Sequence, residues 1–139
     1  MNWTIQPFDL PAYDEVMALW RRCEGIGLSD ADSREAMAAY LERNPGMSFV
    51  AQADGKVVGA ILSGHDGRRG YIQHLAVDLR WRRRGMARQL VGRCLAVLKA
   101  AGIGKAHIFI FTDNESGRAF WESIGWGYRT EIRVVSKTL

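Results

Sequence analysis

The chain has 139 residues, of which 47% are hydrophobic and 24% are charged, and its formal net charge is +4. This length and composition predict one folded domain over residues 1–139 and exclude a disordered chain. No stretch approaches the roughly 18 consecutive apolar residues of a membrane span, and no secretion signal opens the chain, so we expect a cytoplasmic protein without a membrane partner.

The first part of the chain predicts a strand, two helices and three further strands. The spacing of apolar residues predicts a first helix that Gly25 ends. Asp54-Gly55 separates two β-rich runs, which is a strong hairpin signal. In chain order we expect a strand at 3–8, helices at about 10–24 and from Asp30 or Asp32 to about 43, and strands at 48–53, 56–64 and 71–79.

The remaining part predicts a long helix, a strand, a short helix and a last strand. The long helix extends from about Arg84 to Gly102. KAHIFIF, residues 105–111, predicts a strand, Asn114 opens a helix, and residues 127–139 predict the last strand. The fold class is therefore α+β, with one mixed, mostly antiparallel sheet flanked by helices in the order β-α-α-β-β-β-α-β-α-β.

Five arginines gather within residues 80–88, and without them the chain would carry a formal charge of about −1. This stretch joins a strand to a helix. A helix N-terminus has unpaired N–H groups and a partial positive charge, which together favour an anion. Cationic side chains are unfavourable there for the helix alone, so their presence indicates a bound anion. Gly85 and Ala87 let a ligand approach the backbone, and Arg-x-x-Gly-x-Ala at 82–87 predicts a pyrophosphate site.

Other interpretations of this stretch remain open at this level. The arginines could form a solvated surface loop in which Gly85 is only a turn residue. The chain has neither G-x-G-x-x-G nor a GxxxxGK[ST] phosphate loop. Proteins that bind nucleic acid usually spread positive charge along a whole face, whereas this chain concentrates it, so we expect no nucleic-acid partner.

HLAVDLRWRRRGMARQLV resembles the cofactor motif of the GNAT superfamily, the Gcn5-related N-acetyltransferases. That motif is a Leu-Ala-Val-like triplet, then [Gln/Arg]-x-x-Gly-x-[Gly/Ala], then a helix. DNESGRAFWESIGW resembles the second motif of the family, about 30 residues further on. GHDGRRGYIQHLAV is similar to a bacterial branch of acetyltransferases. The resemblance implies a GNAT fold and an acetyl-CoA-dependent N-acetyltransferase.

The resemblance also implies roles for individual residues. Backbone N–H groups at the start of the helix would bind the pyrophosphate of acetyl-CoA, and the neighbouring guanidinium groups would pair with its phosphates. The main chain of the preceding triplet would pair with the pantetheine arm, in a V-shaped gap between the strands at 70–78 and 105–111, and would stabilise an oxyanion. The implied cofactor-binding residues are Leu75, Ala76, Val77, Arg82, Arg83, Arg84, Gly85, Met86, Ala87, Arg88, Asn114 and Trp121.

The catalytic residues depart from the family pattern. Trp121 stands where the family frequently has a tyrosine that protonates the departing thiolate, and an indole N–H does not titrate usefully. Trp121 could still pack on the sulfur end of the cofactor. Tyr71 and Tyr128 are alternatives that no motif supports, and water or the acceptor could supply the proton instead.

His74 is the candidate base, because it lies just before the triplet and histidine has an ordinary pKa near 6.5. A histidine packed beneath the sheet is the alternative. Trp20 and Glu24 are candidate acceptor-binding residues, since the resemblance places this segment along the acceptor wall, although both could be structural. The histidines show no convergent spacing, so we expect no metal.

The leading hypothesis is direct transfer of an acetyl group from acetyl-CoA to a primary amine of a small molecule or peptide, without a covalent enzyme intermediate. The alternatives are a non-catalytic regulatory module that binds acyl-CoA and, less favoured, a nucleic-acid-binding module. The acceptor and the oligomeric state stay open, with a homodimer as the expectation that the family suggests.

Overall fold

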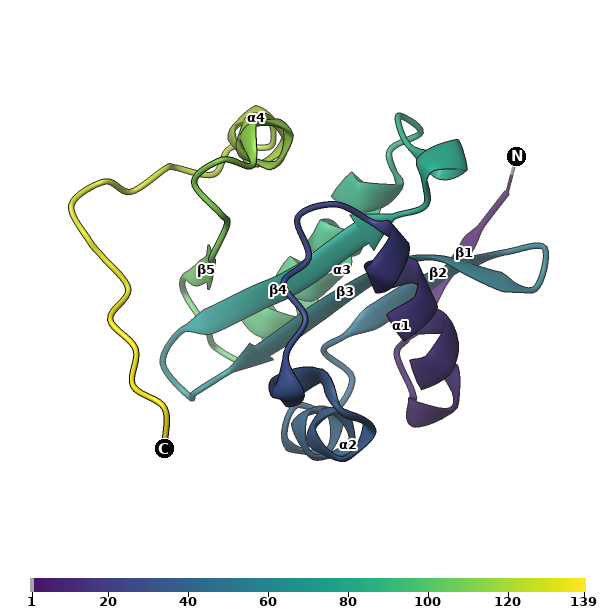
Figure 1. Ribbon diagram of the computed structural model, residues 1–139, viewed down its shortest axis with the longest axis horizontal. Coiled ribbons are helices and arrows are strands. Elements are labelled where there is room, and N and C mark those ends of the chain that lie inside the picture. Colours follow the sequence, from purple (N-terminus) through teal and green to yellow (C-terminus); the bar gives the residue numbers. More distant parts are fainter. Residues whose placement is uncertain (1) are drawn as a thin grey trace. The chain divides into compact units, whose positions relative to one another are not determined.

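The computed structural model describes residues 2–139 in two compact units, one ending at Phe109 and one extending from Ile110 to Leu139. The first unit contains a five-stranded sheet in the order β1-β2-β3-β4-β5 (Figure 1). Its strands are β1 (Thr4–Pro7), β2 (Phe49–Ala53), β3 (Lys56–His65), β4 (Gly70–Val77) and β5 (Ala106–Ile108). The first four pair antiparallel and β5 pairs parallel to β4, which confirms the mixed, mostly antiparallel sheet.

Helices cover both faces of this sheet. Figure 1 shows α1 (Tyr13–Arg22) and α2 (Arg34–Arg43) on one face and α3 (Met86–Ala100) on the other. Most of the apolar positions that predicted α1 and α3 are buried, because each helix turns one side towards the sheet. Leu95 of α3 is an exception, at 38% exposed. The buried apolar residues of these two helices are Tyr13, Val16, Met17, Leu19, Trp20, Met86, Leu90, Val91, Cys94 and Leu98.

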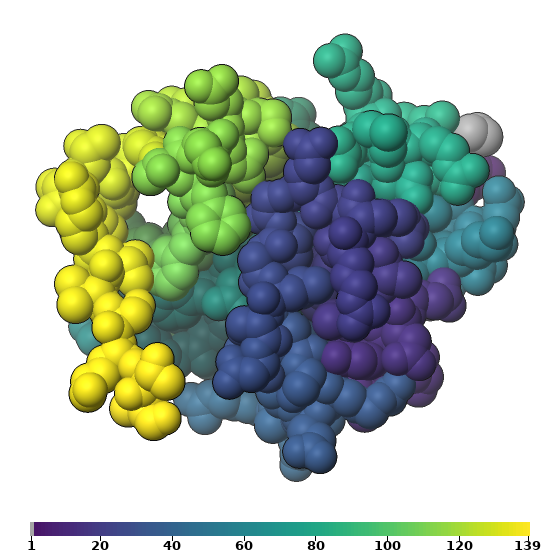
Figure 2. All heavy atoms as spheres, in the orientation of Figure 1, coloured from purple at the N-terminus to yellow at the C-terminus, as the bar shows by residue number. Residues whose placement is uncertain are grey.

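Short 3₁₀ turns precede three of the helices: η1 (Leu10–Ala12), η2 (Asp30–Asp32) and η3 (Leu79–Trp81). Ser29 and Asp32 form a capping box around η2, and Ser33 caps α2. The chain between α1 and α2 crosses the sheet on the face seen in Figure 2, where it appears in dark blue. The second helix therefore begins later than predicted, since the capping signal at Asp30–Asp32 belongs to a separate turn.

A β-bulge interrupts the pairing of β4 with β3. Leu62 pairs with Gln73 and Ala60 with Ala76, so Ile61 alone stands opposite both His74 and Leu75. His74 adopts a left-handed backbone conformation with φ of 53°. Such an extra residue bends a strand and often lies beside a functional site.

The ladder between β4 and β5 ends next to this bulge. It joins Gly70–Ile72 to Ala106–Ile108, and in the described part of the chain residues 73–77 have only β3 as a strand neighbour. The predicted strand at 105–111 is therefore too long. A strand persists only where a neighbour supplies its hydrogen bonds, and the pairing with β4 ends at Ile108.

The second unit contains α4 (Glu115–Ser123), which Asn114 caps as predicted. The expected last strand at 127–139 is wrong: these residues form no regular element. Their β-branched composition is typical of a strand, but composition favours this conformation only where another strand is available to pair. The order of the preceding elements is confirmed.

None of the helices within residues 2–139 has the length and apolar composition needed to cross a membrane. A single acetyltransferase domain over residues 1–139 stays a prediction.

Candidate active site

Asp78 organises the junction between β4 and α3. Its side chain accepts a hydrogen bond from the backbone N–H of Arg80 at 3.0 Å and pairs with the Arg22 guanidinium at 2.9 Å. Burial raises the pKa of Asp78, but the Arg80 N–H and the Arg22 guanidinium outweigh that effect and hold it below the ordinary value of 3.8. The junction is thus fixed to α1 by an ionised carboxylate.

Helix α3 begins without a side-chain cap. Its N-cap residue is Gly85, which has a φ of 86°, and a Cβ built at this position would meet nothing within 4 Å. Arg83 is also left-handed, with a φ of 63°. The first turn of α3 therefore presents backbone N–H groups at an open surface, and this arrangement fits an anion such as a pyrophosphate.

Arg80 pairs with Asp78 at 3.6 Å, and the other four arginine side chains of this loop divide into two groups. Arg82 Nε donates to the Val77 carbonyl at 3.0 Å, and the Arg84 guanidinium donates to the Arg80 carbonyl at 3.1 Å while lying over the Trp81 ring. Arg83 and Arg88 are exposed and have no partner among residues 2–139. The first group shapes the loop, and the second leaves its charge available to a ligand.

The triplet Leu75, Ala76 and Val77 completes β4 after the bulge, with Ala76 and Val77 buried. The Val77 carbonyl accepts from Arg82, as described above, and lies 3.8 Å from the Cys23 thiol. On its β5 side the triplet has no strand partner among the described residues. This unpaired edge is where the predicted contacts with a pantetheine arm would form.

His74 is held on three sides. Its Nε2 lies 2.9 Å from Asp32 Oδ1, and its backbone carbonyl accepts a hydrogen bond of 2.8 Å from Trp20 Nε1. The indole of Trp20 meets the imidazole edge to face, with ring centroids 4.9 Å apart. In the sequence, Asp32 predicts only a helix cap, so the carboxylate beside His74 is a residue that sequence reasoning misses.

The two candidate acceptor-binding residues differ in exposure. Trp20 is 1% exposed, so it offers no surface to an acceptor, and the structure corrects this expectation to a supporting contact beneath His74. Large apolar side chains on the sheet side of an amphipathic helix are usually core. Glu24 lies exposed in the turn after α1, with no partner among the described residues.

The second unit contains the remaining predicted residues. Asn114 Oδ1 accepts from the Gly117 backbone N–H at 2.9 Å, so it caps α4. Trp121 packs against Trp126 with ring centroids 4.6 Å apart. Tyr128 lies under the Arg118 guanidinium in this unit, whereas Tyr71 in the first unit packs against His107.

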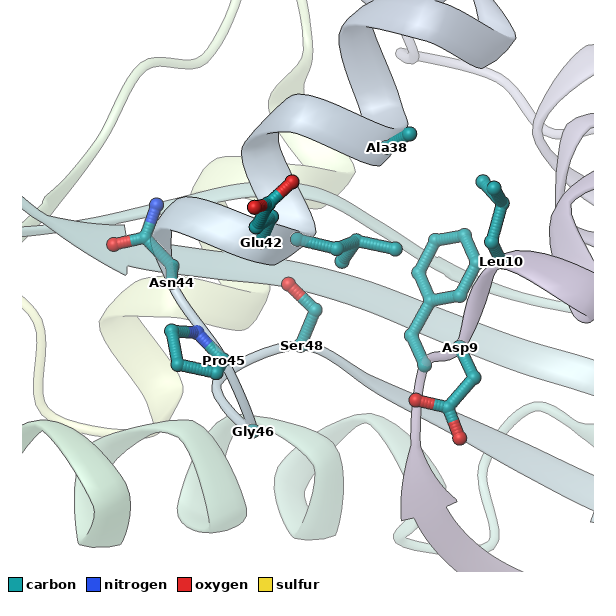
Figure 3. Close-up of a pocket in the computed structure, with 10 residues that line it drawn as sticks. Asp9, Leu10, Ala38, Glu42, Asn44, Pro45, Gly46 and Ser48 are labelled. Atoms are coloured by element: carbon teal, nitrogen blue, oxygen red, sulfur yellow. The ribbon is translucent and has the colours of Figure 1, made fainter.

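A cavity of about 260 Å³ lies elsewhere, between the end of β1, α2 and the loop at 44–48. Figure 3 shows Asp9 at one end and Asn44 and Pro45 at the other. Asn44 Oδ1 accepts from the His65 backbone N–H, and the Ser48 hydroxyl accepts from the Ser63 backbone N–H. These buried polar groups are already paired within the fold, and neither His74 nor the start of α3 lines the cavity.

Comparison with known proteins decides the family. The sequence model of the acetyltransferase (GNAT) family matches residues 13–126. An acetyltransferase of Sodalis glossinidius is 30% identical over 135 residues, which cover 97% of this chain and 94% of the relative. The chain belongs to the GNAT acetyltransferase family. An uncharacterized N-acetyltransferase of Yersinia pestis is also 30% identical, over 94% of this chain and 91% of the relative.

Solved GNAT structures share the fold at lower identity. Ard1 from Thermoplasma volcanium superposes with a TM-score of 0.82 and 20% identity, over 94% of this chain and 86% of that protein. The PaiA N-acetyltransferase from Thermoplasma acidophilum, solved with coenzyme A, gives a TM-score of 0.81 and 15% identity, over 93% and 92% of the two chains. These structures confirm the GNAT-like α+β fold. The family model and the curated relatives confirm the classification as an acetyltransferase.

Proposed function

We propose that this GNAT protein transfers the acetyl group of acetyl-CoA directly to a primary amine of a small molecule or peptide. One observation carries the proposal. The single strand β4 carries His74, then the unpaired edge of Leu75–Val77, and leads through η3 to the uncapped start of α3 at Gly85. A candidate base and an anion site on one short stretch of chain match the needs of acetyl transfer from a phosphorylated donor.

The start of α3 would hold the pyrophosphate through backbone N–H groups from Arg83 to Arg88. Its open surface supports this assignment, as do the exposed side chains of Arg83 and Arg88. Leu75 and Val77 would bind the pantetheine arm by main-chain hydrogen bonds. Asn114 and Trp121 keep the donor contacts that the resemblance to the family implies for them.

His74 would act as the base. It takes a proton from the acceptor ammonium, and the lone pair left on the amine attacks the thioester carbonyl. A backbone N–H near the triplet would stabilise the resulting oxyanion. The intermediate then breaks its carbon–sulfur bond, and the thiolate takes a proton from Tyr71, Tyr128 or water. The former amine nitrogen loses its second proton as the amide forms, and this proton restores the group that protonated the thiolate. Glu24 remains a candidate for contact with the cationic acceptor because it is exposed and negatively charged.

Calorimetric titration with acetyl-CoA, and then with CoA, tests the donor site. Gly85→Trp should abolish binding, because the bulky side chain would occupy the open surface beside the N–H groups. Gly102→Trp is the matched control: Gly102 ends the same helix with a φ of 85° and has nothing within 4 Å of its Cβ position. Both variants should lose about 1–2 kcal/mol of stability from the left-handed backbone, but only Gly85→Trp should lose the ligand. Absence of binding by the unsubstituted protein would overturn the proposal.

Thiol release during a screen of amines then tests turnover. Burial raises the pKa of the Cys94 thiol to about 12 and also raises that of Cys23. Both thiols are therefore poor nucleophiles at neutral pH and add little background. Binding of acetyl-CoA without release of CoA for any amine would favour the regulatory module over the enzyme.

A further inference from the structure

The pair formed by Asp32 and His74 has a feature that the proposed function does not use. Asp32 is 4% exposed, and both of its carboxylate oxygens have partners. Oδ2 accepts the backbone N–H of Ser29 at 3.0 Å, and Oδ1 lies 2.9 Å from Nε2 of His74. The Tyr13 hydroxyl donates to the Asp32 carbonyl and holds the same turn from α1. The carboxylate is thus fixed in position and in orientation.

The imidazole has little freedom to turn away from Asp32. The side chain of His74 is 17% exposed, and Trp20, itself fully buried, packs across its ring. The Trp20 indole also holds the carbonyl of His74, so the backbone of the bulge and the ring are positioned together. Among residues 2–139, no group pairs with the other ring nitrogen, Nδ1.

These contacts select one tautomer of the ring. An ionised carboxylate can only accept hydrogen bonds, so the nitrogen that faces it must carry the proton. Neutral His74 then has its proton on Nε2 and its free lone pair on Nδ1. The pairing also specifies which atom is basic, because the second nitrogen of an imidazole is an acceptor when the first is a donor.

We propose that Asp32 is a positioning residue that holds His74 as the Nε2–H tautomer and makes Nδ1 the atom that deprotonates the acceptor. This proposal rests on the proposed function. The N–H bond of the acceptor ammonium breaks, its electron pair stays on the amine nitrogen, and an N–H bond forms at Nδ1. The carboxylate of Asp32 then faces a cationic imidazolium and stabilises it without taking the proton, and Nδ1 later returns the proton to solvent.

Asp32→Asn reverses this arrangement with almost no change in shape. The asparagine oxygen can still accept from Ser29, while its amide N–H₂ group would donate to Nε2 and leave the proton on Nδ1. The turnover number should fall at least about 100-fold, the range expected when a general base is lost. The Kd for acetyl-CoA should change less than about twofold, since Asp32 does not contact the proposed donor site. Asp30→Asn is the matched control, because Asp30 lies exposed in the same 3₁₀ turn.

Nitrogen-15 NMR of the histidine side chains tests the tautomer without requiring any activity. The neutral His74 of the unsubstituted protein should carry its proton on Nε2, and in Asp32→Asn the proton should move to Nδ1. Substitution of each of the three histidines by glutamine assigns the signals. A proton on Nδ1 in the unsubstituted protein would overturn the proposal, and so would an unchanged turnover number in Asp32→Asn.

The two proposals fail in different ways. If no amine is acetylated, the proposed function fails while the NMR result still decides whether Asp32 sets the tautomer. If turnover occurs but the ring has its proton on Nδ1, acetyl transfer stands and the role of Asp32 is refuted. If Asp32→Asn does not fold, the tautomer of the unsubstituted protein decides, since that spectrum requires no variant.

Discussion

Asp78 shows how a single side chain can connect the sheet to the donor site. It caps η3 and pairs with Arg22 of α1, at the point where β4 ends. Its contacts hold its pKa below the ordinary value of 3.8. Because the folded-state pKa is depressed, the carboxylate stabilises the fold above pH 3.8, and this contribution is lost as the pH falls through the folded-state pKa.

Asp78→Asn should therefore lower the free energy of unfolding at neutral pH by about 1 kcal/mol, a modest value because the Arg22 side chain is 48% exposed. Asparagine still caps η3, so the variant removes the charge alone. Urea unfolding of both proteins at several pH values measures the effect. The difference should shrink as the pH falls below 3.8 and through the depressed folded-state pKa of Asp78, and a difference that is constant across this range would show that the charge contributes nothing.

At the scale of elements, the position of α3 depends on the absence of a side chain on β3. A Cβ at Gly59 would lie 2.9 Å from the Met86 sulfur and 3.2 Å from Leu90 Cδ1. Met86 is the first residue of α3. This close approach of helix to sheet therefore determines how far the proposed donor site lies from the strands. In interiors packed this closely, even a single added methyl group lowers stability or displaces its neighbours.

Gly59→Ala should lower the free energy of unfolding by about 1–2 kcal/mol, because the buried side chains of Met86 and Leu90 must move. Acetyl-CoA binding should weaken if this movement displaces the first turn of α3. Gly92→Ala, within α3 itself, should have the opposite effect on stability. Nothing lies within 4 Å of its Cβ position, so alanine should stabilise α3 by about 0.5–1 kcal/mol. Urea unfolding measures both changes, and equal stability of Gly59→Ala and the unsubstituted protein would mean that Met86 yields without cost.

Local signals predicted most of these elements. The apolar spacing of α3, the Asp54-Gly55 hairpin and the Asn114 cap each depend on residues within a few positions of one another. The family motifs also lie on the elements where the resemblance placed them. These features were predictable because local backbone geometry determines them.

Contacts between distant residues were not predictable in this way. Asp32 and His74 are 42 residues apart, and the Ser-x-x-Asp spacing at 29–32 indicates only a cap. The bulge was not predicted, since no glycine marks its left-handed position. The prediction of a strand at 127–139 is wrong for the opposite reason. The local composition of this tail favours a strand, whether or not a neighbouring strand is present to pair with it.

At the scale of the whole molecule, the position of the positive charge, and not only its total, should determine how strongly an anionic ligand is attracted. Arg80→Glu with Arg83→Glu, and Arg68→Glu with Arg69→Glu, each bring the formal net charge from +4 to zero. If the net charge governs attraction, the two double variants should behave alike. The arrangement of the site predicts that they differ, since only Arg80 and Arg83 lie beside the start of α3.

The first double variant should weaken acetyl-CoA binding by about tenfold at low salt, with a smaller effect at high salt, and the second should leave it nearly unchanged. Calorimetric titration at two salt concentrations measures this difference. Equal losses in both variants would show that the general field of the protein, rather than the loop, attracts the ligand.

The bulge in β4 also has a consequence for how the chain can change. The pairs Leu62–Gln73 and Ala60–Ala76 would both persist if the extra residue were absent, so the sheet does not need the residue at position 74. Its left-handed backbone nevertheless restricts what can replace it, since asparagine, aspartate and histidine are the side chains most tolerant of this conformation. Two of those three are titratable. The backbone thus favours proton-carrying side chains at a position that the strand pairing does not require, and new chemistry can arise there without a new fold.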